Sequence, residues 1–263
     1  MAERLAVPAH PVEAEDLDAA GLVAGTVPFS AVDGPGNRFV VFLQGCQWDC
    51  LVCHNPCSIP RTPPGMRTTP VAEVVEQVGD AAPFLTGVTV TGGEATLQAG
   101  FVHALFTRLA ADPRTGRLTR FVDSNGDTPT STWARLAPVT DGVMLDLKAL
   151  DDEMHVVLVG HSNARVLASI ADLAGRGLLQ EVRLLLVPGL NDADDVLERT
   201  AHWLLGHDPD VRVRVNLFRR EGARPCARDL LEPGPADEER YRRVLAAAGV
   251  RRVDLWCGTG TGS

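Results

Sequence analysis

Six short apolar runs alternate with segments of helical periodicity along most of this 263-residue chain. Two neighbouring parallel strands need a long crossover between them, usually a helix, so this alternation is typical of βα units around a parallel sheet. We therefore predict an α/β fold with parallel strands and outer helices. The strands are expected at residues 38–44, 87–91, 119–123, 142–147, 181–187 and 211–217, and the helices between them at residues 71–78, 100–110, 130–136, 164–174 and 193–205.

The segments on either side of these units complete a single predicted domain. Residues 1–25 are rich in Ala, Pro and acidic residues, and we expect them to be poorly ordered. Residues 26–217 form the predicted core barrel. Residues 218–263 form a C-terminal extension that closes it, with a helix at 237–248 and a strand at 253–256. No linker or repeat divides the chain, and 45% hydrophobic residues suffice for one large core.

Composition excludes several classes of partner. No stretch approaches the ~18 uninterrupted apolar residues of a membrane span, and residues 1–22 have neither the basic nor the apolar region of a signal peptide. A net charge of -9 repels phosphate backbones. We therefore expect a cytoplasmic protein that binds neither a membrane nor a nucleic acid.

Each predicted strand is followed by a polar or glycine-rich cluster. The carboxyl ends of the strands of a βα barrel converge on one face, and that face carries the chemistry. Polar βα turns explain any single cluster, but they explain Asp146 and Lys148 poorly, because unpaired charges at an apolar strand end are costly. Lys148 is also the only lysine among 25 basic residues. It is there either by chance or because its site needs a compact ammonium. The clusters lie at residues 45–55, 92–94, 124–126, 146–148, 188–189 and 219–220.

Three of the six cysteines fall within eight residues, as Cys46-x3-Cys50-x2-Cys53. Six cysteines are too few for a disulfide scaffold in a chain of this length, which favours metal ligands or core thiols. Three thiolates on one tight loop can hold three irons of a 4Fe-4S cluster and leave the fourth iron open for chemistry.

Two other interpretations of the cysteine loop stay open. The run from Cys50 to His54 matches the C-x-x-C-H haem attachment pattern, although such haem belongs mostly to exported proteins. A structural zinc would need a fourth ligand, which His54 or Cys57 could offer. We expect Cys57, Cys226 and Cys257 to be isolated packing or surface thiols.

Four motifs in order resemble radical SAM enzymes of the glycyl radical enzyme activase group, which includes pyruvate formate-lyase activase. They are the cysteine loop at residues 45–56, Asp-Gly-Pro-Gly-Asn-Arg at 33–38, Gly-Gly-Glu at 92–94 and Asp-Leu-Lys at 146–148. The resemblance runs from about residue 26 to residue 217. Residues 91–96, 122–126 and 144–149 most resemble YjjW-type activases, but the cysteine-rich ferredoxin-like insert of that type is missing, so one cluster is expected.

The resemblance implies a partial (β/α)6 barrel of the radical SAM type. It implies that the open iron binds S-adenosylmethionine, whose reductive cleavage gives a radical that abstracts a hydrogen from a glycine of a partner glycyl radical enzyme. A low-potential donor such as flavodoxin or ferredoxin would supply the electron to a monomeric activase. A radical SAM enzyme acting on a small molecule or a ribosomal peptide, and a non-catalytic iron-sulfur or zinc protein, remain alternatives.

The resemblance also implies residue roles. Cys46, Cys50 and Cys53 would ligate the cluster, and the Glu94 carboxylate would accept a charge-assisted bond from the cofactor's ammonium. Many relatives have an aromatic residue at the place of Val52, and others have a histidine near Arg219. The contacts that these residues would make with the adenosine of the cofactor therefore differ in this chain. The implied cofactor-binding residues are Val52, His54, Gly92, Gly93, Glu94, Asp123, Ser124, Asp146, Leu147 and Lys148. The residues implied to hold a monovalent cation are Asp123, Ser124, Met144 and Asp146.

Overall fold

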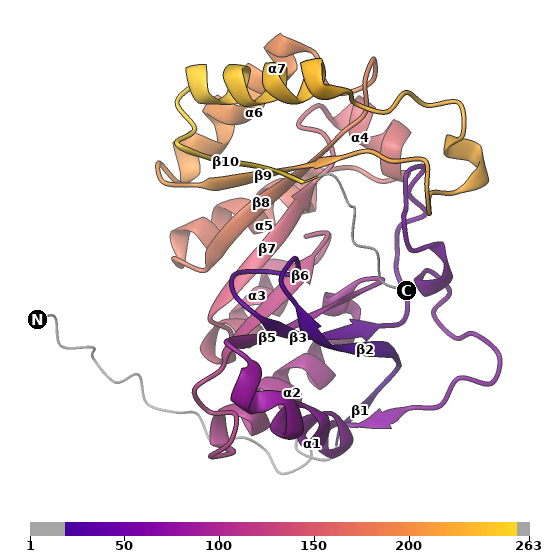
Figure 1. The fold of residues 1–263 in the computed structure, drawn as a ribbon, viewed down its shortest axis with the longest axis vertical. Coiled ribbons are helices and arrows are strands. Elements are labelled where there is room, and N and C mark those ends of the chain that lie inside the picture. Colours follow the sequence, from indigo (N-terminus) through magenta and orange to yellow (C-terminus); the bar gives the residue numbers. More distant parts are fainter. Residues whose placement is uncertain (1–18, 257–263) are drawn as a thin grey trace, which may run out of the picture.

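A computed structural model describes residues 19–256, which form one curved eight-stranded sheet with helices packed on it (Figure 1). The sheet order is β10-β9-β8-β7-β6-β5-β3-β2, and all neighbours are parallel except β2 and β3. The predicted α/β class and the six parallel strands are confirmed, each within two residues of its expected bounds. These strands are β3 (Arg38–Leu43), β5 (Gly87–Gly92), β6 (Thr119–Ser124), β7 (Gly142–Leu147), β8 (Leu179–Leu186) and β9 (Arg212–Leu217).

The two edges of the sheet come from the ends of the described chain. Strand β2 (Val23–Ser30) is antiparallel to β3, and β10 (Arg252–Trp256) is parallel to β9. Between residues 19 and 256, β2 and β10 do not pair with each other, so the barrel is partial. A two-stranded ladder joins β1 (Ala20–Gly21) to β4 (Thr69–Pro70).

The N-terminal expectation needs a correction. We expected residues 1–25 to be poorly ordered, yet β1 and the start of β2 lie within them. The edge of β3, an apolar central strand, supplies hydrogen-bond partners that composition alone does not reveal. Residues 1–18 lie outside the described residues, as does Cys257.

The helices lie on the outer face of the sheet and bury their apolar sides against it (Figure 1). All of the helices predicted between the strands are present. The α-helices are α1 (Val71–Ala81), α2 (Ala99–Ala111), α3 (Thr130–Leu136), α4 (Asp152–Val159), α5 (Ala164–Gly175), α6 (Asp194–His207) and α7 (Pro235–Ala247). The 3-10 helices are η2 (Pro56–Ser58), η3 (Ala82–Phe84), η4 (Ala95–Gln98), η5 (Ala137–Val139) and η6 (Pro225–Ala227).

Helix α4 was not predicted as a helix. It follows β7 directly and is short, but both of its ends are marked in the sequence. The Asp151 side chain accepts hydrogen bonds from the main-chain N–H groups of Glu153 and Met154, and Gly160 ends the helix with a φ of 81°. The acidic run at residues 151–153 therefore stands at a helix start, where carboxylates complement the helix dipole.

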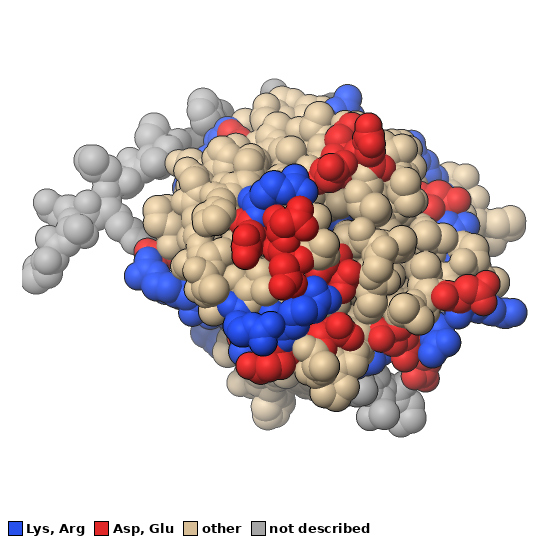
Figure 2. Space-filling model, turned by 90° about the horizontal axis from the view of Figure 1, so that it is seen from above, with Lys and Arg blue, Asp and Glu red and all other residues tan. Residues whose placement is uncertain are grey.

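Charged side chains of both signs are interspersed on the face seen in Figure 2, the side on which α6 and α7 lie in Figure 1. Arg240 of α7, for example, lies 2.8 Å from Asp194 of α6. None of the helices between residues 19 and 256 is long and apolar enough to cross a bilayer.

A buried arginine ties three strands together at their amino ends. Arg38 is fully buried, and its guanidinium donates to the Thr89 hydroxyl and the Val88 carbonyl at 2.6 Å each. It also donates to the Thr119 carbonyl at 3.1 Å and lies 4.2 Å from the centre of the Phe121 ring. Arg38 thus links β3 to β5 and β6, the strands whose opposite ends carry the cysteine and glycine loops.

We predict that Arg38→Met lowers the free energy of unfolding by about 2 to 4 kcal/mol, because buried carbonyls and hydroxyls lose a charged donor. Urea unfolding followed by circular dichroism measures this change. Arg242→Met on the exposed side of α7 is the control. A loss no larger than that of the control would contradict the assigned role.

Candidate functional site

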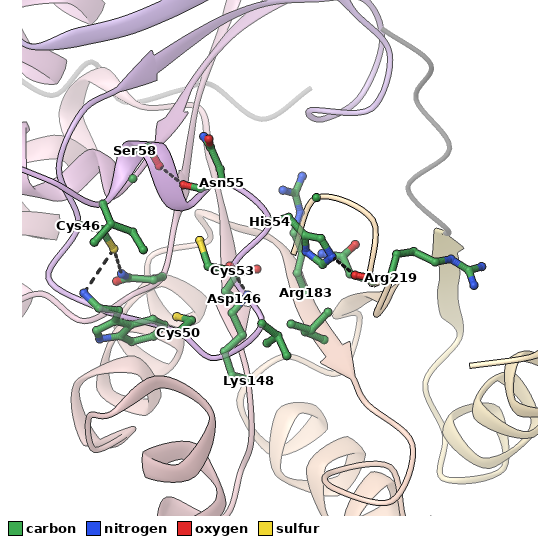
Figure 3. Close-up of a pocket in the computed structure, with 18 of the residues that line it drawn as sticks. Cys46, Cys50, Cys53, His54, Asn55, Ser58, Asp146, Lys148, Arg183 and Arg219 are labelled. Atoms are coloured by element: carbon green, nitrogen blue, oxygen red, sulfur yellow. Dashed lines mark hydrogen bonds and ion pairs between the residues drawn. The ribbon is translucent and has the colours of Figure 1, made fainter. Parts of the chain in front are cut away.

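The carboxyl ends of the parallel strands enclose a cavity of about 810 Å³ (Figure 3). This is the face on which the sequence predicted the chemistry. Of the predicted site residues, Cys46, Cys50, Val52, Cys53, His54, Gly92, Gly93, Asp146 and Lys148 line it. The other lining residues are Trp48, Asn55, Ser58, Ile59, Asn125, Arg183, Leu185, Asn216, Leu217, Arg219, Glu221, Gly222, Glu232 and Trp256.

The three clustered cysteines are free thiols on the loop after β3. Burial raises the pKa of Cys46 to about 11 and that of Cys50 to about 12, and it also raises the pKa of Cys53. Thiols in such surroundings stay protonated unless a cation stabilises the thiolate. Bound iron supplies that charge, so metal binding would release protons here.

The donor set fits an iron-sulfur cluster better than a single ion. In the described part of the chain, no three His, Cys, Asp or Glu side chains converge closely enough to hold one metal ion. The three thiols instead face one cavity from separate points of its wall (Figure 3). A cluster whose irons each take one thiolate needs this wider arrangement.

The main chain after β5 lies directly against the main chain at the start of the cysteine loop, and Gly92 and Gly93 make this approach possible. Gly93 donates its N–H to the Leu43 carbonyl at 2.8 Å, and Glu94 donates to the Gly45 carbonyl at 2.7 Å. A Cβ at Gly92, which has a φ of +126°, or at Gly93 would lie 2.2 Å from backbone atoms of Leu43 or Gly45. Only glycine allows this close approach of two main chains.

Glu94 has a different environment from the one predicted for it. We expected its carboxylate to accept a hydrogen bond from the cofactor's ammonium. Glu94 is instead 1% exposed, and it is not among the described lining residues. Oε1 accepts from the Thr96 N–H at 2.8 Å, the Thr96 hydroxyl at 2.6 Å and the Ser124 hydroxyl at 2.8 Å. Oε2 accepts from the Asn125 N–H at 2.7 Å. Burial raises the pKa of Glu94, these donors oppose the rise, and the side chain joins the loop after β5 to the end of β6.

Asp146 and Lys148 form an ion pair in the cavity wall, with Nζ 2.7 Å from Oδ2. Burial tends to lower the pKa of Lys148, but the Asp146 carboxylate offsets this and the net change is upward. Lys148 therefore stays an ammonium, close enough to Cys50 and Cys53 to influence both thiols. Leu147, between them in the sequence, is a core residue and is not among the described lining residues.

Arg183 was not identified from the sequence, and it contacts two of the residues expected to hold the monovalent cation. Its guanidinium donates to Asp123 Oδ2 at 2.9 Å and to the sulfur of Met144 at 3.0 Å. Burial raises the pKa of Asp123, and the guanidinium opposes that rise. Since the Ser124 hydroxyl donates to Glu94 and Asp146 is paired with Lys148, all four expected cation ligands already have partners. Asp146 was identified because it is a charged residue in an apolar strand. Arg183 in β8 has the same feature and could have been identified in the same way.

Two lining residues from the last strands were also missed. The Asn216 Oδ1 atom is buried without a hydrogen-bond partner in the described structure, and Trp256 contributes an aromatic ring from β10. Val52, where an aromatic residue was expected by resemblance, is instead packed in an apolar group with Leu185 and Phe218. The cavity therefore has aromatic and polar residues on its C-terminal wall as well as on the cysteine loop, which contributes Trp48, His54 and Asn55.

Comparisons with known proteins agree with this geometry. The family model of the radical SAM superfamily matches residues 40–204. The chain is 36% identical over 193 residues to the pyruvate formate-lyase-activating enzyme of Streptococcus mutans, covering 70% of this chain and 72% of that one. It is 41% identical over 178 residues to the pyruvate formate-lyase 1-activating enzyme of Escherichia coli K12, covering 65% and 70%. A radical SAM methyltransferase from Sphaerobacter thermophilus shares the fold, with a TM-score of 0.65 at 20% identity over 83% of this chain and 66% of that one.

We predict that Glu94→Ala destabilises the cluster-free protein by about 2 to 3 kcal/mol, because four buried donors lose a charged acceptor. Thermal or urea unfolding without cofactor measures the change. Glu198→Ala, on the exposed face of α6, is the matched control and should shift stability by less than about 0.5 kcal/mol. Equal stability of the two variants would mean that Glu94 is free to act on the cofactor directly.

Proposed function

The chain belongs to the radical SAM superfamily, among the activating enzymes of glycyl radical enzymes, and we propose that it uses S-adenosylmethionine to place a radical on a glycine of a partner enzyme. The observation that carries the proposal is the meeting of three half-buried thiols, the Gly92-Gly93 turn and the Asp146–Lys148 pair around one cavity. Similarity to activating enzymes over about two thirds of the chain favours this function over a small-molecule or purely binding role.

Cys46, Cys50 and Cys53 would each hold one iron of a 4Fe-4S cluster, with the fourth iron facing the cavity. When bound, the reduced cluster supplies the electron that breaks the bond between sulfur and C5′ of S-adenosylmethionine. The chain's own residues position the cofactor and exclude water. Burial of the thiols and the apolar group around Val52 keep solvent from the iron ligands.

Lys148 would donate from its ammonium to the carboxylate or ribose of S-adenosylmethionine, and Asp146 would hold that ammonium in place. Gly92 and Gly93 would let the methionine part approach the main chain. Glu94 would act indirectly, by fixing the loop that carries both glycines. We do not extend the proposal to a monovalent cation, because Arg183 already contacts Asp123 and Met144.

The remaining parts of the proposal concern the surroundings of the reaction. The protein partner is a glycyl radical enzyme, and the electron comes from a low-potential carrier of the flavodoxin or ferredoxin class. The activase works as a monomer in the cytoplasm. The relatives named as pyruvate formate-lyase-activating enzymes support this class of partner.

We predict about four irons per chain after anaerobic reconstitution, as expected for a three-thiolate cluster with one open iron. Changing Cys46, Cys50 or Cys53 to Ala should abolish the cluster, measured by iron content and absorbance. Cys57→Ser and Cys226→Ser, both at exposed thiols, are the controls and should keep it. About eight irons, with loss upon either control change, would reveal a second cluster and contradict the proposal.

We predict that the reduced, reconstituted protein cleaves S-adenosylmethionine to methionine and 5′-deoxyadenosine, and that Lys148→Arg weakens cofactor binding about tenfold or more. The guanidinium keeps the charge, but it is larger and planar and cannot present one ammonium beside Asp146. Chromatography measures cleavage and calorimetry measures affinity. The exposed Arg176→Lys is the neutral control. Wild-type cleavage and affinity in Lys148→Arg would remove the lysine from the proposed site.

A further inference from the structure

The second half of the cysteine loop is held by a segment about 165 residues further along the chain, residues 218–230, which we call the strap. His54 Nε2 lies 2.7 Å from the Arg219 carbonyl (Figure 3), and the His54 ring lies 5.9 Å from that of Phe218. The Cys226 thiol lies 3.8 Å from the Leu51 carbonyl. The strap therefore contacts the loop on both sides of Cys53.

Apolar packing joins the same two segments. Val52 lies in a buried group with Phe218 and Ala227 of the strap and Leu185 of β8. This packing fixes the distance between loop and strap but is not directional. Hydrogen bonds have to set the orientation of the loop.

Arg224 supplies the directional contacts. Its Nη1 donates to the Asp49 carbonyl at 2.9 Å, to the Cys50 carbonyl at 3.2 Å and to Asp49 Oδ1 at 2.6 Å, while Nη2 lies 3.2 Å from Asp49 Oδ2. The Asp49 side chain is 71% exposed, so its ion pair adds little. The Arg224 side chain is only 26% exposed, and the contacts that matter are those with the main chain beside Cys50.

The loop needs such support because its own hydrogen bonds are few. It has no helix or strand between residues 46 and 53. Trp48 anchors the first half through a 2.9 Å bond from its indole N–H to Asp127. In the second half, the Leu51 N–H donates to Leu158 and the Cys53 N–H to Cys50 at 3.3 Å. Without the strap, the segment from Asp49 to Cys53 would lose its contacts on the cavity's C-terminal side.

We propose that Arg224 is a positioning residue for the iron-sulfur cluster: it holds the Asp49 and Cys50 carbonyls, on either side of the Cys50 α-carbon, so that Cys50 and Cys53 reach their irons, and its charge eases reduction of the cluster. This inference rests on the proposed function. Reduction potentials of iron-sulfur clusters depend on nearby charge and hydrogen bonding, so a guanidinium against a ligand's carbonyl has a measurable effect.

The test compares the reconstituted wild-type protein with four variants: Arg224→Gln, Arg224→Lys, Asp49→Asn and Arg228→Gln. The first readout is the rate of iron loss to a chelator, and the second is the midpoint potential of the cluster from EPR-monitored redox titration. Arg228 is the matched control, an exposed arginine of the same strap. Urea unfolding of each cluster-free protein verifies that the fold is intact.

Arg224→Gln should lose iron about tenfold faster, the effect of one lost charge-assisted bond, and its midpoint potential should be more negative. Arg224→Lys should recover the potential but only part of the iron retention, because an ammonium keeps the charge without the planar fork. Asp49→Asn should change iron loss by less than about twofold. Arg228→Gln should match the wild type in both readouts.

The outcomes separate this inference from the proposed function. A wild-type protein that takes up no iron would contradict the proposed function itself. A loaded wild-type protein with Arg224→Gln indistinguishable from Arg228→Gln would overturn the role of Arg224. Faster iron loss in Arg224→Gln with an unchanged potential would also overturn it, because Arg224 would then be a structural brace without influence on the reduction potential of the cluster.

Discussion

The site depends on the contact between two main chains, the end of β3 and the end of β5. The bonds from Gly93 to Leu43 and from Glu94 to Gly45 bring the cysteine loop against the glycine turn at van der Waals distance. Any side chain at position 92 or 93 would push the two loops apart. Iron ligands and cofactor contacts come from different strands, so their common cavity exists only while this approach is kept.

Charge pairing explains how a polar cavity is tolerated inside an apolar barrel. Lys148 is paired with Asp146, and the Arg183 guanidinium bridges Asp123 and Glu181 at 2.9 and 2.8 Å. Both of these cationic side chains in the cavity wall thus have an opposite charge beside them, which limits the cost of removing them from water. The same pairing keeps an ammonium and a guanidinium at the cavity wall, ready for an anionic group of a ligand.

Much of this arrangement was predictable from the sequence, and most of the contacts that could not be predicted join residues far apart in the chain. Apolar runs located all six parallel strands, and the polar clusters after them located the cavity. We expected the Glu94 carboxylate to contact the cofactor, but residue type does not tell which donors of the chain reach it, and Thr96, Ser124 and Asn125 do. The hydrogen bonds of Arg224 to the cysteine loop join residues about 175 positions apart, and no local sequence pattern predicts such a contact.

The most direct test of the central claim is whether the protein creates a stable radical on a glycine of another protein. Reduced, reconstituted protein is mixed anaerobically with S-adenosylmethionine and a glycyl radical enzyme, and EPR spectra are recorded. We expect a carbon-centred radical signal on the partner whose hyperfine splitting collapses when its glycines carry deuterium at Cα. Cleavage of S-adenosylmethionine with no radical on any such partner would contradict the activase function and leave a radical SAM enzyme with another substrate.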